Sequence, residues 1–400
     1  MIKKNLLRFL YNIKTKNYKR IYVAYSGGLD STVLLHALYK INLFKISALH
    51  INHNISNYSN LCEKQCEKFA SNIGINLNIR KILLKNKKQC LESDFRLHRY
   101  KSFFKMVKKE SILLLAHHAQ DQIETYLFRL FKGSGNNGLS SIKPISNIFN
   151  VNCVRPLLIF NKEDIYKYAV VNNLTWCEDP ANKNTLISRN YIRYYIYNNI
   201  VKFWPMATRT ISRSIKLLQI QDIMINKSVK SILIKSKGLK KNTININFLL
   251  SLEIDIQFMV LRHWIKMNKI KMPTFKQLKH LYIEVVLSRT YSNSKFYLNN
   301  VIIKKYNYDL FMLNNVKYNK KNFKHMIWNS TSKIVLYDGR KYITDRFKKK
   351  MPLLIKFKYN NKKVKKIMQK NNVPIWERKT TPLIFKGSYF MDILYQSETI

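Results

Sequence analysis

The most distinctive stretch of the chain is residues 21–31, which read Ile-Tyr-Val-Ala-Tyr-Ser-Gly-Gly-Leu-Asp-Ser. The β-branched and aromatic run at its start predicts a strand, Ser-Gly-Gly predicts a tight turn, and the apolar spacing of residues 32–38 predicts a helix. Adjacent glycines let an anion approach the backbone, and the free N–H groups of a helix's first turn point toward it. The stretch therefore predicts a phosphate-binding loop at residues 26–31.

Asp30 is the unusual member of this loop. A carboxylate beside a phosphate is repulsive unless a divalent cation lies between them, and Mg²⁺ is normally held by one or two carboxylates together with phosphate oxygens. The loop therefore predicts a nucleotide with Mg²⁺, and Asp30 as the metal ligand. A Gly-Gly pair alone is a common turn, so the expectation depends on the full string.

The chain is long and strongly basic. Its 400 residues suggest two or three domains, and 72 Lys and Arg against 22 Asp and Glu give a formal net charge of +50. Such a charge favours binding to a polyanion, RNA or DNA above all. The chain is also rich in Ile and Asn, so compositional drift accounts for part of the charge, and the charge alone does not prove nucleic-acid binding.

Strand-like and helix-like segments alternate after the loop. Further strands are predicted at 45–51, 76–84 and 111–116, and helices between them at 60–73 and 93–109. Strands separated by helices of this length predict an α/β domain with a doubly wound parallel sheet. Ligands of such sheets bind at the carboxyl ends of the strands.

Polar residues follow two of these predicted strands. The second strand leads into His50 and His53, and the fourth leads into His117 and the helix that carries Asp121 and Glu124. The two carboxylates are three residues apart and share a helix face, which suits a cation or a ligand ammonium. Acids at a helix N-terminus also complement the dipole, but their place at the end of a buried strand favours a site.

Two further segments are ambiguous. The Gly-rich segment, residues 132–140, is either a linker or a mobile lid that closes over substrate. Arg96 and Arg99 share one face of a predicted helix, where they either bind a phosphate or face solvent.

The second half of the chain is less distinctive. Residues 206–315 are predicted to form a largely helical domain. Residues 316–400 are predicted to form a small α+β domain in which short strands alternate with basic turns. Trp264 is expected in a core rather than on a base-stacking surface. Lysines at 348–350 and 362–366 are candidate phosphate contacts that would make binding sensitive to salt. The predicted domains are 1–205, 206–315 and 316–400.

The five cysteines form no Cys-x-x-Cys pair. Cys62 and Cys66 lie four apart on a predicted helix and are expected to be small buried side chains, and no zinc or iron–sulfur site is predicted. The basic N-terminus lacks a secretory apolar core, and no stretch reaches the ~20 apolar residues of a membrane span. A cytoplasmic protein without membrane contact is expected.

Several motifs together resemble one family. The loop at 26–31 is similar to the pyrophosphate-binding loop of N-type ATP pyrophosphatases, and a series of motifs in the same order resembles the tRNA(Ile)-lysidine synthetases. These motifs are His50-Ile-Asn-His53, Phe95-Arg96-Leu-His-Arg99-Tyr100, Ala116-His117-His118 with Asp121-Gln122-x-Glu124, Gly133-Ser-Gly-x-x-Gly138, Arg155-Pro-Leu-Leu158, Trp176-Cys-Glu-Asp-Pro180, Arg189-Asn-x-x-Arg193, Lys365-Lys366 and Val373-Pro-x-Trp376-x-Arg378. Gln120 replaces a commonly acidic residue, and Asn54 a more usual glycine.

The resemblance implies an enzyme that attaches free L-lysine to the wobble cytidine of an isoleucine tRNA, with ATP and Mg²⁺ as cofactors. ATP would adenylate O2 of the cytidine, and the lysine ε-amine would then displace AMP. The implied catalytic residues are Asp30, Asp121 and Glu124. The implied ATP-binding residues are Ser26, Gly27, Gly28, Leu29, Asp30, Ser31, His50, His53 and His117. The implied substrate or tRNA contacts are Arg96, Arg99, Gly133, Arg189, Arg193, Lys365, Lys366 and Arg378. A homodimer is left open.

Three alternatives compete with this hypothesis. A tRNA thiolase of the same superfamily would usually show paired catalytic cysteines, which this chain lacks. An amide-forming synthetase of the asparagine synthetase type would need an N-terminal glutaminase domain with a cysteine nucleophile, whereas this chain begins Met1-Ile2. A basic RNA-binding protein without catalysis would not need an intact loop with Asp121 and Glu124.

Overall fold

The chain forms two compact units, Met1–Ile225 and Asn226–Ile400. The computed structural model describes residues 2–14, 18, 20–52, 57–82, 92–108, 110–238, 240, 242–289, 292, 294–314, 326–328, 333–335, 341–343, 353–357 and 361–394. His53 and the lysines at 348–350 lie outside the described residues. The predicted boundaries at 205 and 315 stay predictions.

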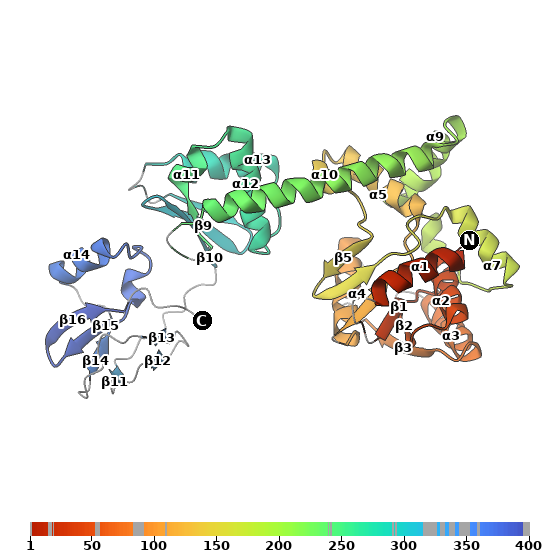
Figure 1. Ribbon diagram of the computed structural model, residues 1–400, viewed down its shortest axis with the longest axis horizontal. Coiled ribbons are helices and arrows are strands. Elements are labelled where there is room, and N and C mark those ends of the chain that lie inside the picture. Colours follow the sequence, from red (N-terminus) through yellow and green to blue (C-terminus); the bar gives the residue numbers. More distant parts are fainter. Residues whose placement is uncertain are drawn as a thin grey trace. The chain divides into compact units, whose positions relative to one another are not determined.

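A six-stranded sheet forms the centre of the first unit (Figure 1), in the order β3-β2-β1-β4-β6-β5. Its strands are β1 (Arg20–Ala24), β2 (Ile46–Asn52), β3 (Asn76–Lys81), β4 (Ser111–Leu114), β5 (Ile145–Ile148) and β6 (Val151–Val154). All neighbours pair in parallel except the edge strand β5, which is antiparallel to β6. The predicted doubly wound α/β sheet is confirmed.

Helices cover both faces of this sheet because the strands are apolar on both sides. Alternate residues of β1 point to opposite faces, so Ile21 and Val23 join one core and Tyr22 joins the other. The first core is closed by α1 (Ile2–Lys14), α2 (Leu29–Ile41), α3 (Asn57–Asn72) and α7 (Lys162–Val171). The second core contains Tyr100 and Phe103 of α4 (Glu92–Met106).

The carboxyl ends of β1, β2 and β4 lie side by side at one edge of the sheet, since these strands are parallel neighbours. The phosphate-binding loop follows β1, and α5 (Ala119–Phe131) begins shortly after β4. The topology therefore brings residues 26–31 and the start of α5 to the same edge.

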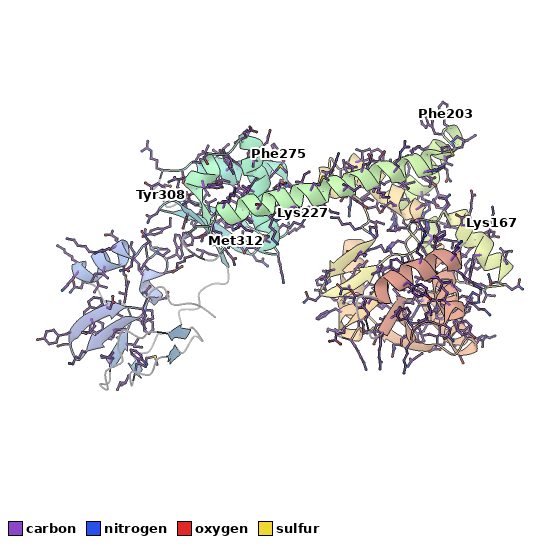
Figure 2. All side chains as sticks on the ribbon, in the orientation of Figure 1. Lys167, Phe203, Lys227, Phe275, Tyr308 and Met312 are labelled. Carbon is purple, nitrogen blue, oxygen red and sulfur yellow. The ribbon has the colours of Figure 1, made fainter. Side chains whose placement is uncertain are left out.

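The first unit continues with helices beyond the sheet. They are α6 (Asn136–Leu139), α8 (Ser188–Tyr191), a π-helical segment (Ile192–Tyr197), α9 (Asn198–Phe203) and α10 (Ala207–Lys235). Phe203, labelled at the end of α9 in Figure 2, is exposed. The 29-residue helix α10 includes the residues on both sides of the boundary between the units.

The second unit begins with helices, as expected. They are α11 (Ile246–Leu250), α12 (Ile254–Met267) and α13 (Phe275–Leu281), the last continued by a π-helical segment (Tyr282–Val286). Trp264 is buried, and its Nε1 donates to the Asn242 carbonyl oxygen at 2.8 Å, which confirms its expected place in a core.

Residues 295–314 differ from the largely helical expectation, because they form strands. An antiparallel sheet has the order β7-β10-β9-β8, and its strands are β7 (Ile244–Asn245), β8 (Lys295–Leu298), β9 (Val301–Tyr306) and β10 (Asp309–Asn314). The apolar residues of these strands pack against α12 and α13 in one core. The short turns between β8, β9 and β10 hold Asn residues with positive φ, at Asn299 and Asn307.

A second antiparallel sheet lies near the C-terminus, in the order β11-β14-β15-β16. Its strands are β11 (Met326–Trp328), β14 (Leu353–Lys356), β15 (Leu383–Lys386) and β16 (Tyr389–Ile393). Helix α14 (Lys362–Lys370) packs its Val364 and Met368 against this sheet, and β12 (Lys333–Val335) pairs with β13 (Lys341–Ile343). This mixture agrees with the predicted small α+β region.

Trp376 connects the C-terminal region to the preceding sheet within the second unit. Its ring lies 5.8 Å from that of Tyr306 and 5.4 Å from that of Phe311, both nearly perpendicular. Among the described residues, no helix combines the length and the apolar character needed to cross a membrane.

Candidate active site

The two serines of the loop after β1 form hydrogen bonds within the loop. Ser31 Oγ donates to the Gly28 carbonyl oxygen at 2.9 Å, accepts from Ser26 N at 3.2 Å, and lies 3.1 Å from Ser26 Oγ. Ser26 is exposed, and α2 begins at Leu29 directly after the turn. The N–H groups of the first turn of α2 therefore face the loop without intrahelical partners, as an anion site requires.

Gly27 has no room for a side chain. Its φ is +84°, and a Cβ atom there would lie 2.6 Å from Cys62 Sγ, 2.7 Å from Cys66 Sγ and 3.4 Å from Cys177 Sγ. The buried positions of Cys62 and Cys66 confirm the prediction that they are small core residues. Burial raises the pKa of the Cys177 thiol to about 12, so this thiol adds no negative charge beneath the loop at neutral pH.

Asp30 is the polar group of the loop that lacks a partner. Its side chain is 31% exposed, yet Oδ1 is buried with no hydrogen-bond partner among the described residues. Oδ2 lies 3.7 Å from His118 Nε2. Burial raises the pKa of Asp30 above its usual range, and the charge of Asp121 adds to this against the opposing effect of His118.

Two arginines saturate the carboxylate pair of α5. Arg193 donates from Nε to Glu124 Oε1 at 2.6 Å and from Nη2 to Oε2 at 3.0 Å, while Arg189 donates from Nε to Oε2 at 3.0 Å. Arg189 also donates from Nη2 to Asp121 Oδ1 at 2.8 Å. Asp121 and Glu124 do share a face, as the spacing predicts, and that face meets the helical segment that carries Arg189 and Arg193.

The two carboxylates differ in access. The Glu124 side chain is fully buried, whereas that of Asp121 remains 12% exposed. Burial alone would raise the pKa of Asp121, but His118, Arg189 and His117 together hold it well below its usual range. Asp121 is therefore a permanent anion at neutral pH, with one oxygen, Oδ2, accepting from His118 N at 3.0 Å.

The predicted histidines are only partly described. His50, at the end of β2, is buried, and its Nδ1 lies 2.9 Å from the Tyr25 carbonyl oxygen. Burial lowers the pKa of His50, which keeps the ring neutral. His117 is half-buried between β4 and α5, next to the loop edge. His53 has no described position.

The other predicted substrate contacts are spread over the chain. Arg96 and Arg99 lie on α4, and the side chain of Arg96 is outside the described part. Gly133 has a φ of +64° and follows the end of α5, with its N–H donating to the Leu130 carbonyl oxygen at 2.9 Å. Gly133 thus has a structural reason to be glycine.

Lys365 and Lys366 lie on α14 in the second unit, and both side chains are exposed. Arg378 is engaged there instead, because its Nε donates to the Val373 carbonyl oxygen and its Nη2 to the Tyr306 hydroxyl, both at 3.1 Å. These three residues belong to a different unit from the loop and α5.

Sequence reasoning assigned no role to His118 and Cys177. His118 Nε2 lies 3.7 Å from Asp30 Oδ2 and 3.6 Å from Asp121 Oδ2, so it lies between the loop and α5. Cys177 N donates to the Gly27 carbonyl oxygen at 2.9 Å and fixes the turn from 150 residues further along the chain. Both residues lie in motifs that resemble the family, Ala116-His117-His118 and Trp176-Cys-Glu-Asp-Pro180, but the sequence does not show what either side chain contacts.

The site suits a metal carried by a nucleotide better than a resident metal. The described residues contain no group of three His, Cys, Asp or Glu side chains that could hold an ion. Asp30 Oδ1 is buried and unpaired beside an anion-binding turn. One carboxylate oxygen together with phosphate oxygens and water is a typical Mg²⁺ environment, so the residues present fit the ion.

A mostly parallel sheet with a Ser-Gly-Gly turn, a carboxylate and a helix N-terminus after its first strand is the arrangement of an ATP-pyrophosphatase type of α/β domain. A family model described as a PP-loop domain matches residues 1–200. Models described as a TilS substrate binding domain and a TilS substrate C-terminal domain match residues 245–311 and 346–393.

Two curated relatives cover 95% and 72% of this chain. A tRNA(Ile)-lysidine synthase of Buchnera aphidicola subsp. Baizongia pistaciae is 34% identical over 95% of this chain and 91% of its own length. One of Wigglesworthia glossinidia brevipalpis is 38% identical over 72% of this chain and 74% of its own length. The chain belongs to the tRNA(Ile)-lysidine synthase family. This membership confirms the resemblance and favours it over a thiolase or a non-catalytic RNA-binding protein.

Proposed function

We propose that the protein ligates L-lysine to C2 of the wobble cytidine of an isoleucine tRNA, using ATP and releasing AMP and pyrophosphate. The observation that carries this proposal is that the loop at residues 26–31 and the start of α5 lie next to each other at one edge of the sheet. The loop has hydrogen-bond donors and a carboxylate, Asp30, with one oxygen that has no partner among the described residues. Asp121 adds a negative charge on the other side of His118, which lies between the two aspartates.

The loop is assigned to the phosphates of ATP. Ser26, Gly27, Gly28 and the first turn of α2 would surround the leaving pyrophosphate, which needs donors as its negative charge develops. Mg²⁺, held by Asp30 and phosphate oxygens, would supply further charge neutralisation when bound. His50 and His117 flank this edge and are proposed nucleotide contacts.

The reaction has two balanced steps. The cytidine O2 attacks the α-phosphorus, a bond forms between them, and the bond to the β-phosphate oxygen breaks to release pyrophosphate. The free ε-amine of lysine then attacks C2, the bond from C2 to O2 breaks, and AMP leaves with that oxygen. The lysine ammonium loses one proton to water before the attack, and the attacking nitrogen loses a second proton to water as the new carbon–nitrogen bond forms. Neither step requires a covalent bond to the protein.

Asp121 and Glu124 are given different roles in this mechanism. Asp121 keeps some exposure and a pKa below its usual range, so it suits electrostatic binding of a lysine ammonium better than proton removal. Glu124 is fully buried between the guanidinium groups of Arg189 and Arg193, so we propose that it positions these arginines.

Recognition of tRNA is assigned to exposed basic residues. Exposed lysines occur along α10, including Lys227 (Figure 2), and on α14 at Lys365 and Lys366. Each lysine that pairs with a phosphate should add about 0.7 to 0.9 to the slope of log Kd against log salt, so its removal should reduce that slope by the same amount. Filter binding of Lys365→Ala/Lys366→Ala at several salt concentrations tests this, and an unchanged slope would remove α14 from the interface.

The decisive experiment measures transfer of labelled lysine. The protein is incubated with ATP, Mg²⁺, labelled lysine and the isoleucine tRNA that carries a wobble cytidine, and a matched tRNA with uridine at that position is the control. Label is expected in the first tRNA only, and only with ATP. Absence of ATP-dependent label would refute the proposed ligation, and tRNA binding without label would favour a non-catalytic RNA-binding protein.

Two further proposals concern the protein's assembly and its place in the cell. We propose a cytoplasmic location because the substrate tRNA is used there by ribosomes. A homodimer stays a prediction, and light scattering of the purified chain with and without tRNA would test it.

A further inference from the structure

The Gly-rich segment, residues 132–140, has the composition of a linker or a mobile lid, but it has many specific contacts within the first unit. It follows α5, contains α6, and leads to Ser141, Ile142 and Lys143 before β5. Its main partner is the part of α10 between Leu218 and Asp222, about 80 residues further along the chain.

Asp222 is the charged member of this contact. Its side chain is only 4% exposed; Oδ1 accepts from Asn137 Nδ2 at 2.9 Å, and Oδ2 accepts from Lys143 Nζ at 2.5 Å. Burying a carboxylate is costly unless it is paired and hydrogen-bonded. Asn137 and Lys143 provide this pairing, so Asp222 resists movement of the segment between them.

Gln219 lies one helical turn before Asp222 and holds the same segment by its backbone. Its Nε2 donates to the Ser140 carbonyl oxygen at 2.9 Å and to the Ile142 carbonyl oxygen at 3.0 Å. Two neighbouring groups on one face of α10 thus fix both the side chains and the backbone of the segment.

Ser141 and Ile142, which directly follow the Gly-rich segment, contact the helix that carries the carboxylate pair. Ile142 N donates to Gln122 Oε1 at 2.9 Å, and Ser141 Oγ donates to the Gln122 carbonyl oxygen at 2.8 Å. Gln122 is buried and directly follows Asp121. A connected set of hydrogen bonds therefore links Asp222, through residues 137–143, to the first turns of α5.

We infer that Asp222 is a positioning residue for lysine transfer, acting through the Gly-rich segment on the part of α5 that carries Asp121 and Glu124. This inference rests on the proposed ligation. Asp222 holds Asn137 and Lys143 in place, and residues between them hydrogen-bond to Gln122 on α5. Misplacement of catalytic groups by as little as 1 Å can cost about 100-fold in rate, so loss of this bracing should lower turnover rather than tRNA affinity.

Exchanging the charges of Asp222 and Lys143 distinguishes a role in positioning α5 from a role in fold stability alone. Asp222→Ala is expected to reduce kcat for lysine transfer about 10- to 100-fold with little change in the Kd for tRNA. Lys143→Ala should give a similar but smaller loss. The double variant Asp222→Lys/Lys143→Asp restores the opposite charges and should recover most of the turnover. Gln221→Ala is the matched control, because Gln221 is the exposed neighbour on α10.

A second readout does not depend on catalysis. Limited trypsin digestion after Lys132, which is exposed, should be faster in Asp222→Ala than in the wild type or Gln221→Ala. Wild-type turnover in Asp222→Ala, or a charge exchange as inactive as Asp222→Ala at equal thermal stability, would overturn the inference. If the wild type itself transfers no lysine, the proposed function fails, and unchanged digestion would then separately refute the bracing of the segment.

Discussion

The loop at residues 26–31 and the charge cluster formed by Asp121, Glu124, Arg189 and Arg193 lie at the same edge of the sheet but satisfy their polar groups in opposite ways. In the loop, Asp30 Oδ1 is buried without a described partner, and Ser26 is exposed. In the cluster, both oxygens of Glu124 and both oxygens of Asp121 accept hydrogen bonds.

The difference predicts which region responds to substrate under the proposed function. An unsatisfied buried oxygen is costly in the free protein, and a bound cation removes that cost. A saturated cluster gains nothing from rearrangement, so it can hold a fixed charge in place before the reaction, which is the arrangement that electrostatic catalysis needs. Under the proposed function, a bound ligand completes the polar contacts of the loop, whereas the cluster already has its contacts within the protein.

The largest effect is expected from Asp30→Asn. This change keeps the size of the side chain but removes the charge that would hold Mg²⁺, which is worth several kcal/mol of transition-state stabilisation. Lysine transfer should fall at least about 1,000-fold. The measurement is single-turnover label transfer, with tRNA Kd measured in parallel. A variant that also loses tRNA binding would contradict the assignment of Asp30 to the phosphate side.

Glu124→Gln should destabilise the fold as well as the site. It removes the buried negative charge that pairs with the partly exposed guanidinium groups of Arg189 and Arg193, and breaking a buried ion pair costs about 3–5 kcal/mol. Chemical denaturation should show this loss. Glu163→Gln, at an exposed position of α7, is the matched control and should change stability little. Equal stability of the two variants would mean that the cluster is not preorganised.

Gly27→Ala and Gly28→Ala form a pair that probes the loop alone. An alanine at Gly27 would need a φ of +84° and would overlap Cys62 and Cys66 Sγ, whereas at Gly28 the nearest atom is 3.6 Å away and φ is −74°. Gly27→Ala should cost about 1–3 kcal/mol of stability. Gly28→Ala should leave stability nearly unchanged. Thermal melts of both variants test the difference, which equal melting temperatures would disprove.

The smallest expected effects are changes in Tm, which should have opposite signs for Asp121→Asn and Asp30→Asn. The pKa of Asp121 is held below its ordinary 3.8, so its ionised form stabilises the fold above that pH and this contribution is lost as the pH falls. The pKa of Asp30 is raised, so its ionised form costs stability at neutral pH, and this cost disappears as the pH falls toward 3.8. At pH 7, Asp121→Asn should therefore lower Tm and Asp30→Asn should raise it. Melts from pH 7 to pH 4 should show the Asp30→Asn difference shrinking; a shift of the same sign in both variants would contradict the assignment.

The local parts of the site were predictable from sequence, because they depend on neighbours in the chain. The strand, turn and helix around residues 26–31 follow from apolar spacing and two glycines, and the common face of Asp121 and Glu124 follows from helical spacing. The doubly wound sheet follows from the alternation of strands and helices.

The long-range parts were not predictable in the same way. The salt bridges of Arg189 and Arg193 to α5 span more than 60 residues and depend on how the segment around residues 188–197 packs against that helix. The Gly-rich segment has the composition of a mobile lid, and its contacts with residues far along the chain, such as Gln219 and Asp222, show that it is held. The strands at 295–314 were not predicted, because their apolar residues follow a helical region and are separated by very short turns.

The hydrogen bond from Cys177 N to the Gly27 carbonyl oxygen determines how much of the chain must be synthesised before the turn at Gly27 is complete. Domains generally fold as units during synthesis, and this turn depends on a residue 150 positions later in the same unit. A nascent chain that ends before Cys177 lacks the N–H group that donates to the Gly27 carbonyl oxygen. The ability to bind a nucleotide should therefore appear only after most of the first unit has been translated.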